Sequence, residues 1–160
     1  MFSDKPFLQY LNFTQKALIK QSFYLLKWAE SNKDKLADYS FLVMPAAKAY
    51  EGFLKQLFFD LKLISKENLS NDHFRVGMAL NPELEQVERL RHKCLYNEIC
   101  QECGEETAQM LWQTWKKCRN RLFHYFPQLQ QVFTLKEAEE RLREIVKAID
   151  LAYQSCLKYY

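Results

Sequence analysis

The sequence contains little glycine and little proline, with three and four residues among 160. Both residue types are frequent in the tight turns that join β-strands, so their scarcity argues against a turn-rich β fold. Leucine, lysine, glutamate, glutamine and alanine, which favour helices, are abundant instead. The composition therefore predicts an all-α protein, and the length favours a single domain.

Long apolar runs are also missing. No uninterrupted apolar segment approaches the roughly 20 residues that a membrane-spanning helix needs. The first residues, Met1 to Pro6, lack the apolar core of a secretory signal. Five cysteines are an odd number, which does not suggest a disulfide framework. From these absences we expect a cytoplasmic protein with no membrane association.

The net charge is weakly informative about partners, and the cysteine spacing does not indicate a metal site. The net charge of +3 is a mild basic excess, which is compatible with nucleic-acid binding but does not demonstrate it. Cys100 and Cys103 form a lone C-x-x-C, and His92 and Cys94 lie upstream. A structural zinc site normally has two well-separated ligand pairs, and one pair here would be irregular. We therefore expect no metal and no cofactor, and interpret these cysteines as buried or incidental thiols.

Apolar periodicity predicts an up-and-down bundle of about five helices. The expected helices cover residues 7–31, 38–64, 82–100, 105–126 and 134–159. Residues 65–82 are polar and are expected to form a loop, with one short turn near residues 73–80. We expect one domain over residues 1–160, with an N-terminal helix and linker at 1–36 and a core at 37–160.

Three local signals locate helix ends. Pro45 either kinks the second helix or marks the start of its main part. Gly104 is expected to end or bend the third helix. Thr134 and Glu137 form a capping box, which is a specific start signal for the last helix.

One short stretch near the end of the fourth expected helix combines three kinds of chemistry. Asn120 follows Arg119 directly, and His124 comes five residues after the arginine, shortly before Pro127. An arginine stays charged at any relevant pH and binds phosphate oxygens with two N–H groups. A histidine takes up and releases a proton near neutral pH. Cations near a helix end also complement the helix dipole, which is the structural alternative.

This stretch resembles the R-N-x-x-x-H signature of HEPN-domain ribonucleases. The segment around Glu51, Ala-Tyr-Glu-Gly-Phe-Leu, resembles the HEPN domain of RnlA/LsoA-type toxins, in which a glutamate at this position joins the arginine and the histidine. The resemblance covers roughly residues 38–160. It implies a HEPN-like bundle and names Arg119, His124, Glu51 and Asn120 as catalytic residues.

The residues alone leave a second interpretation of Glu51. An exposed helix carboxylate is common, and Lys48 and Lys55 lie at the spacing that gives ion pairs along one helix. The small residues nearby, including Gly52, would let another helix approach closely.

The spacing within the motif predicts how its residues can meet. Arg119 and His124 lie about 140° apart around an ideal α-helix, whereas Asn120 and His124 share one face. The long arginine side chain, or a fraying helix end before Pro127, would reduce this separation. The resemblance implies a further route, a homodimer in which the motif helices of two subunits meet at a shared cleft.

RNA cleavage without a metal needs a base for the 2′-hydroxyl, an acid for the leaving 5′-oxygen and a cation near the phosphorane. His124 suits either proton transfer, and Arg119 suits charge stabilisation. Glu51 would orient His124 or hold Arg119, and Asn120 would position a phosphate or the motif backbone. The expected product is a 2′,3′-cyclic phosphate, because the nucleophile belongs to the RNA.

The competing hypothesis is a HEPN-like helical module that binds RNA or a protein partner without cutting. An antitoxin protein is a candidate partner for the enzyme. HEPN toxins that pair with a nucleotidyltransferase resemble R-x-x-x-x-H-x-Y, but here Phe126 occupies the last position and the tyrosine is Tyr125. This departure weakens that particular pairing.

Overall fold

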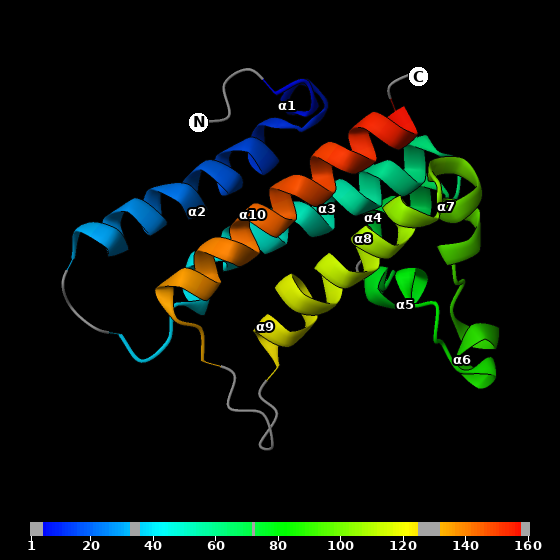
Figure 1. Cartoon of the computed structure of the whole chain (residues 1–160). Helices are drawn as coiled ribbons and strands as arrows, with labels where there is room; N and C mark the ends of the chain where they lie inside the picture. The colour runs from blue at the N-terminus through cyan, green and yellow to red at the C-terminus, as the bar shows by residue number, and fades with distance from the viewer. Residues whose placement is uncertain (1–4, 33–35, 72, 125–131, 158–160) are drawn as a thin grey trace.

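The computed structural model of the chain describes residues 5–32, 36–71, 73–124 and 132–157 (Figure 1). Every regular element within these ranges is a helix, which confirms the all-α fold class. No described helix is long and apolar enough to cross a lipid bilayer.

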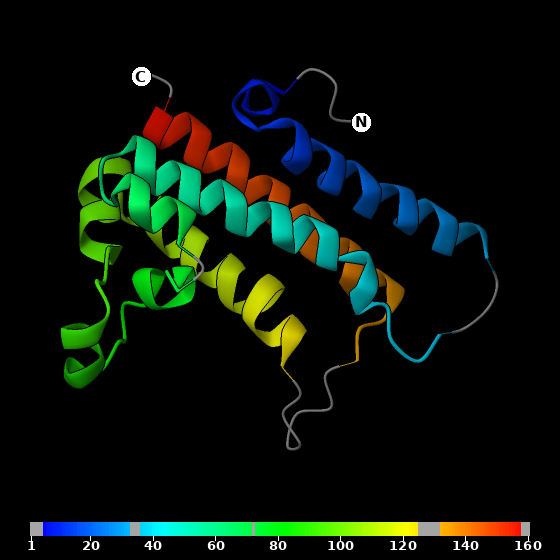
Figure 2. The ribbon, with the colours of Figure 1, turned by 180° about the vertical axis from the view of Figure 1, so that it is seen from behind.

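Four long helical segments run alternately up and down the molecule (Figures 1 and 2). They are α2 (Phe13–Ser31), α3 (Met44–Asp60), the segment that begins with α8 (Glu105–Trp115), and α10 (Leu135–Ala152). The helices α3 and α10 lie in the middle, with α2 on one side and α8 on the other. One apolar core extends through all four segments, from Phe7 to Cys156.

The N-terminal region forms two helices instead of the expected single one. The short α1 (Phe7–Tyr10) ends at Leu11, and α2 begins after Asn12. The Asn12 side chain accepts a hydrogen bond from the Gln15 backbone N–H, and the Gln15 side chain accepts one from the Asn12 N–H. This capping box satisfies the first N–H groups of α2, so the break at Asn12 is stable.

Pro45 marks the start of the second long helix. A 3-10 turn, η1 (Ser40–Leu42), precedes α3, and the proline occupies the first turn of α3, where its missing N–H has no cost. The expected close approach also occurs, because a Cβ on Gly52 would lie 3.1 Å from Nε2 of Gln15 in α2.

Residues 66–103 form four short helices, α4 (Lys66–Ser70), α5 (Val76–Leu80), α6 (Gln86–Arg91) and α7 (Tyr96–Cys103). The turn expected near residues 73–80 is confirmed as α5. The predictions of a loop at 66–70 and of one continuous helix at 82–100 are wrong. The chain turns back after α6 because Leu95 is fully buried and its N–H donates to the Ala79 carbonyl oxygen at 2.7 Å. Gly104 ends α7 with a positive φ of 87°, as expected.

The last helix begins as predicted. Thr134 and Glu137 form both hydrogen bonds of the capping box, and α10 continues into a π-helix, η3 (Tyr153–Leu157). The expected end near Tyr159 lies outside the described residues.

The cysteine prediction is wrong for one pair. Cys103 at the end of α7 and Cys156 in η3 form a disulfide, with Cα atoms 4.7 Å apart. The two cysteines are 53 positions apart, and nothing in the sequence indicates that these two helix ends meet. Cys94, Cys100 and Cys118 are free thiols.

Candidate functional site

The motif helix has three consecutive parts. The helix α8 continues into a π-helix, η2 (Lys116–Asn120), and then into a last turn, α9 (Arg121–Phe123). His124 has extended backbone, with φ −120° and ψ 131°, so the helix ends before residues 125 and 126 where its end was expected. Residues 125 and 126, like Pro127, lie outside the described residues.

The π-helix changes the angular relation within the motif. The Arg121 N–H donates to the Lys116 carbonyl oxygen, five residues earlier, so residues five apart come closer to alignment than in an α-helix. Arg119 and His124 have this spacing. The π-turn and the extended backbone at His124 both depart from the ideal α-helix on which the separation of about 140° is based.

All four sequence-predicted site residues line one cavity of about 400 Å³. They are Glu51, Arg119, Asn120 and His124. This volume falls within the usual range for small-molecule sites, about 300–1,000 Å³. The cavity lies between α3, α5 and the motif helix, so residues 68 positions apart in the sequence meet there.

An ion pair joins the two halves of the site. Nε of Arg119 donates to Oε2 of Glu51 at 3.1 Å, and both side chains are roughly 30% exposed. Lys55, a partner considered for Glu51 on spacing alone, donates to the Asn71 carbonyl oxygen instead. The structure therefore shows the contact between Glu51 and Arg119 that the resemblance implies.

Two aromatic rings lie close to the guanidinium of Arg119. The Cζ atom of Arg119 lies 4.3 Å from the Phe123 ring centroid and 5.6 Å from that of Trp115. These distances allow cation–π attraction. Nη1 and Nη2 of Arg119 have no hydrogen-bond partner among the described residues, so their N–H groups are available for a ligand.

Buried polar groups fix the helices behind the cavity. Tyr50, next to Glu51, is fully buried and donates from its hydroxyl to the Leu111 carbonyl oxygen at 3.0 Å. In η2, Sγ of Cys118 lies 3.4 Å from Oε2 of Glu144 in α10. Burial, together with the negative charge of Glu144, raises the pKa of Cys118 far above its usual value, so this group is a protonated donor.

The opposite wall of the cavity was not predicted. His73 and Arg75, both exposed, line it from the segment before α5. Gly77 in α5 lets this wall approach closely, because a Cβ there would lie 2.5 Å from Nε1 of Trp115. The residues here predict a polar loop with one short turn, and the signal for a binding wall is the His-Phe-Arg run at residues 73–75.

Comparison of the chain with protein-family models, with curated proteins and with solved structures finds no match. The HEPN resemblance therefore rests on the motif residues alone.

Proposed function

We propose that this protein is a metal-independent endoribonuclease with a HEPN-like fold. The observation that carries the proposal is the convergence of Glu51, Arg119, Asn120 and His124 on one cavity from two distant parts of the chain. A chance motif on a helix surface would not require an ion pair to a glutamate 68 residues away, the one expected from the resemblance.

The chemistry follows from the positions of these groups. A histidine takes the proton of the RNA 2′-hydroxyl, and the 2′-oxygen attacks the adjacent phosphorus. The bond from phosphorus to the 5′-oxygen breaks, an acid protonates that oxygen, and a 2′,3′-cyclic phosphate remains. The free Nη groups of Arg119 stabilise the negative charge that develops on the phosphoryl oxygens, while Glu51 holds the guanidinium in place.

The mechanism needs both a base and an acid. In the homodimer that the resemblance implies, each subunit contributes His124 to a shared cleft. The cavity of one chain also contains a second imidazole, His73. His73→Ala separates the two arrangements: full activity favours the pair of His124 residues from two subunits, and loss of activity favours His73 with His124.

The biological role that fits this activity is a cytoplasmic toxin or antiphage effector, which cleaves RNA when its own control is released. An antitoxin protein would supply that control.

The deciding test is incubation of the purified protein with mixed RNA in EDTA. We expect wild type to leave cyclic-phosphate ends, and Arg119→Ala and His124→Ala to lose at least about 100-fold in rate, since general acid–base catalysis contributes that much. Circular dichroism of both variants should match wild type, because both side chains lie at the surface of the cavity. Full cleavage by both variants contradicts the assignment.

The alternative is a HEPN-like module that binds RNA or a protein partner without cutting it. The exposed Arg75 in the same cavity as Arg119 is compatible with such a phosphate-binding surface. RNA that is bound but remains intact, in wild type and in His124→Ala alike, would favour this alternative.

A further inference from the structure

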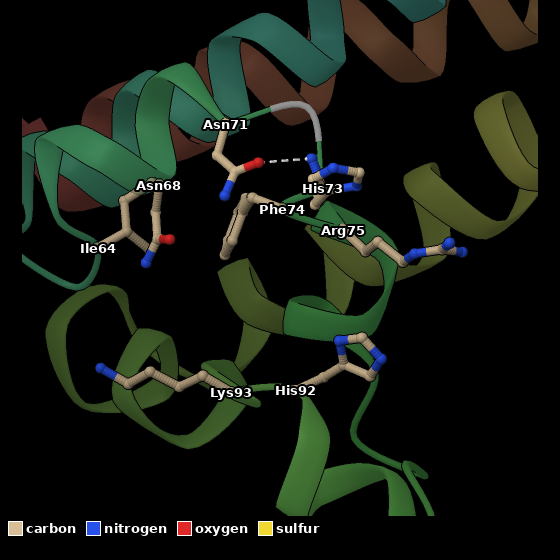
Figure 3. A pocket seen from close by; sticks show the side chains of 8 residues that line it. All are labelled: Ile64, Asn68, Asn71, His73, Phe74, Arg75, His92 and Lys93. Atoms are coloured by element: carbon tan, nitrogen blue, oxygen red, sulfur yellow. Dashed lines mark hydrogen bonds between the residues drawn. The ribbon is translucent and has the colours of Figure 1, made fainter.

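A second cavity lies next to the candidate site. It has a volume of about 240 Å³ and lies between α4, the segment before α5 and the residues that join α6 to α7 (Figure 3). His73, Phe74 and Arg75 line both this cavity and the first one. The two cavities share this three-residue segment as a wall, so a long ligand that binds in one lies next to the other.

The second cavity is basic. Among the described residues that line it there is no carboxylate, whereas Arg75, His92 and Lys93 carry or can carry positive charge. Nζ of Lys93 donates one hydrogen bond, to the Leu63 carbonyl oxygen at 3.1 Å, which leaves two of its three N–H groups for a ligand. Oε2 of Glu88 lies 3.6 Å from Nε2 of His92.

The segment between the cavities offers both a cation and a ring. Arg75 is exposed, and its guanidinium has no hydrogen-bond or ion-pair partner among the described residues. Phe74 is half-buried and projects between Asn68 and Arg75, with His92 and Lys93 on the other side of the cavity (Figure 3). An aromatic ring between cations is the usual arrangement for binding single-stranded nucleic acid, because bases stack on the ring and phosphates contact the cations.

We propose that this second cavity binds the RNA segment that flanks the scissile phosphodiester, with Arg75 and Lys93 on backbone phosphates and Phe74 against a base. The proposal rests on the ribonuclease function and extends it to substrate binding. The amides of Asn68 and Asn71 add hydrogen-bonding groups without negative charge.

The test compares short and long RNA with variants of the second cavity. A dinucleotide fills only the first cavity, whereas a random single-stranded RNA of about 12 nucleotides reaches both. We expect Lys93→Ala to leave dinucleotide cleavage unchanged, to weaken binding of the long RNA, and to reduce the slope of log Kd against log salt by about 0.7. Lys93→Arg should restore binding, and Lys20→Ala, on α2 across the bundle, should behave as wild type.

Phe74 provides an independent variant. Phe74→Leu keeps apolar volume but removes the ring, so binding of the long RNA should weaken about fivefold or more, since stacking on one base contributes at least about 1 kcal/mol. Phe74→Tyr keeps the ring and should bind as wild type does. Circular dichroism and thermal melting check that each variant is folded.

A non-cleavable 2′-O-methyl RNA separates this proposal from the ribonuclease function. If wild type cleaves RNA but Lys93→Ala and Phe74→Leu bind the long RNA normally, the second-cavity proposal is overturned and the ribonuclease stands. If no RNA is cleaved but the 2′-O-methyl RNA binds with the expected variant effects, the RNA-binding cavity stands without catalysis. Absence of salt-dependent RNA binding by wild type overturns the proposal, and a protein partner then becomes the occupant to test.

Discussion

Arg119 has contacts on three sides, and each uses a different property of the guanidinium. Glu51 accepts from Nε, the ring centroids of Phe123 and Trp115 lie 4.3 and 5.6 Å from Cζ, and the Nη groups remain available. A lysine could not make these contacts together, because its ammonium is a point charge without a planar face. The surroundings of Arg119 therefore restrict its orientation before any substrate binds, which reduces the entropy lost on binding.

In the proposed reaction Glu51 acts through Arg119, so loss of its carboxylate should change turnover more than folding. We expect Glu51→Gln to lower kcat about tenfold or more with little change in KM, because the charged hydrogen bond that orients Arg119 becomes a neutral one. The change in melting temperature should be small, since the ion pair is partly exposed.

The measurement is steady-state cleavage of RNA, with Glu106→Gln on the exposed side of α8 as the matched control. Equal kcat values for Glu51→Gln and wild type would show that the ion pair has no part in turnover.

Gly77 should tolerate substitution less well than Gly52. A Cβ at position 77 would lie 2.5 Å from the Trp115 indole nitrogen, so we expect Gly77→Ala to destabilise the fold by about 1–3 kcal/mol and to displace that ring. Gly52→Ala meets only the end of the flexible Gln15 side chain at 3.1 Å and gains helix propensity of about 1 kcal/mol. Urea unfolding followed by tryptophan fluorescence compares them, and the opposite order of stability would contradict the packing argument.

At the scale of elements, Asp38 joins the segment before α3 to the segment before α10. Its Oδ1 accepts from the Phe133 N–H at 2.8 Å and from the Ser40 N–H at 3.1 Å. Burial alone would raise the pKa of this carboxyl, but these hydrogen bonds and others from Ser40 and Tyr39 outweigh it and lower the pKa. The ionised form is therefore the one that the folded protein stabilises.

This shift has a defined sign in the dependence of stability on pH. The lowered pKa contributes stability above the ordinary aspartate value, and that contribution is lost as the pH falls through the pKa of the folded state. Asp38→Asn should therefore melt lower than wild type at pH 7, by about 2–4 °C for each kcal/mol lost. The difference in melting temperature should shrink on acidification towards pH 3. A difference that does not change with pH would contradict the lowered pKa of Asp38.

The elements differ in how well the sequence predicts them. The start of α10 was predictable because the Thr134–Glu137 capping box is local, and the buried stripe of α3 because its period is helical. The continuous helix expected at 82–100 failed because burial of Leu95 against α5 is a tertiary contact that overrides the local period.

The residues of the candidate site also differ in how well the sequence predicts them. Arg119, His124 and Glu51 were identified from a motif, and the structure places them at one cavity. The π-turn that brings them there has no residue signature in the sequence. His73 and Arg75 were missed because their role depends on α5 packing against α8, which no periodic pattern in a short polar segment indicates.

At the scale of the whole molecule, the disulfide joins the end of α7 to the end of the last helix. It closes a loop whose ends are 53 positions apart in the sequence and which contains the motif helix and α10. Reduction, or Cys103→Ser, should lower the free energy of unfolding by about 3–4 kcal/mol, because the cross-link restricts the unfolded chain. Thermal melts with and without a reductant measure this, with Cys94→Ser as the control. If a reductant still lowers the melting temperature of Cys103→Ser, the lost stability does not come from this disulfide.

The π-turn also changes what an altered chain length does to the protein. A π-turn holds one more residue than the α-helical turn that it replaces, so deleting a residue there, such as the exposed Lys117, permits an ordinary α-helix. The residues after the deletion would then keep their orientation relative to α3, because the turn loses only its extra residue. One residue added to the regular helix α8 would instead rotate Arg119 by about 100° away from Glu51. Every motif residue would survive in such a lengthened chain, yet the site would be lost. Spacing upstream of Arg119 is thus as much a part of the motif as the residues that name it.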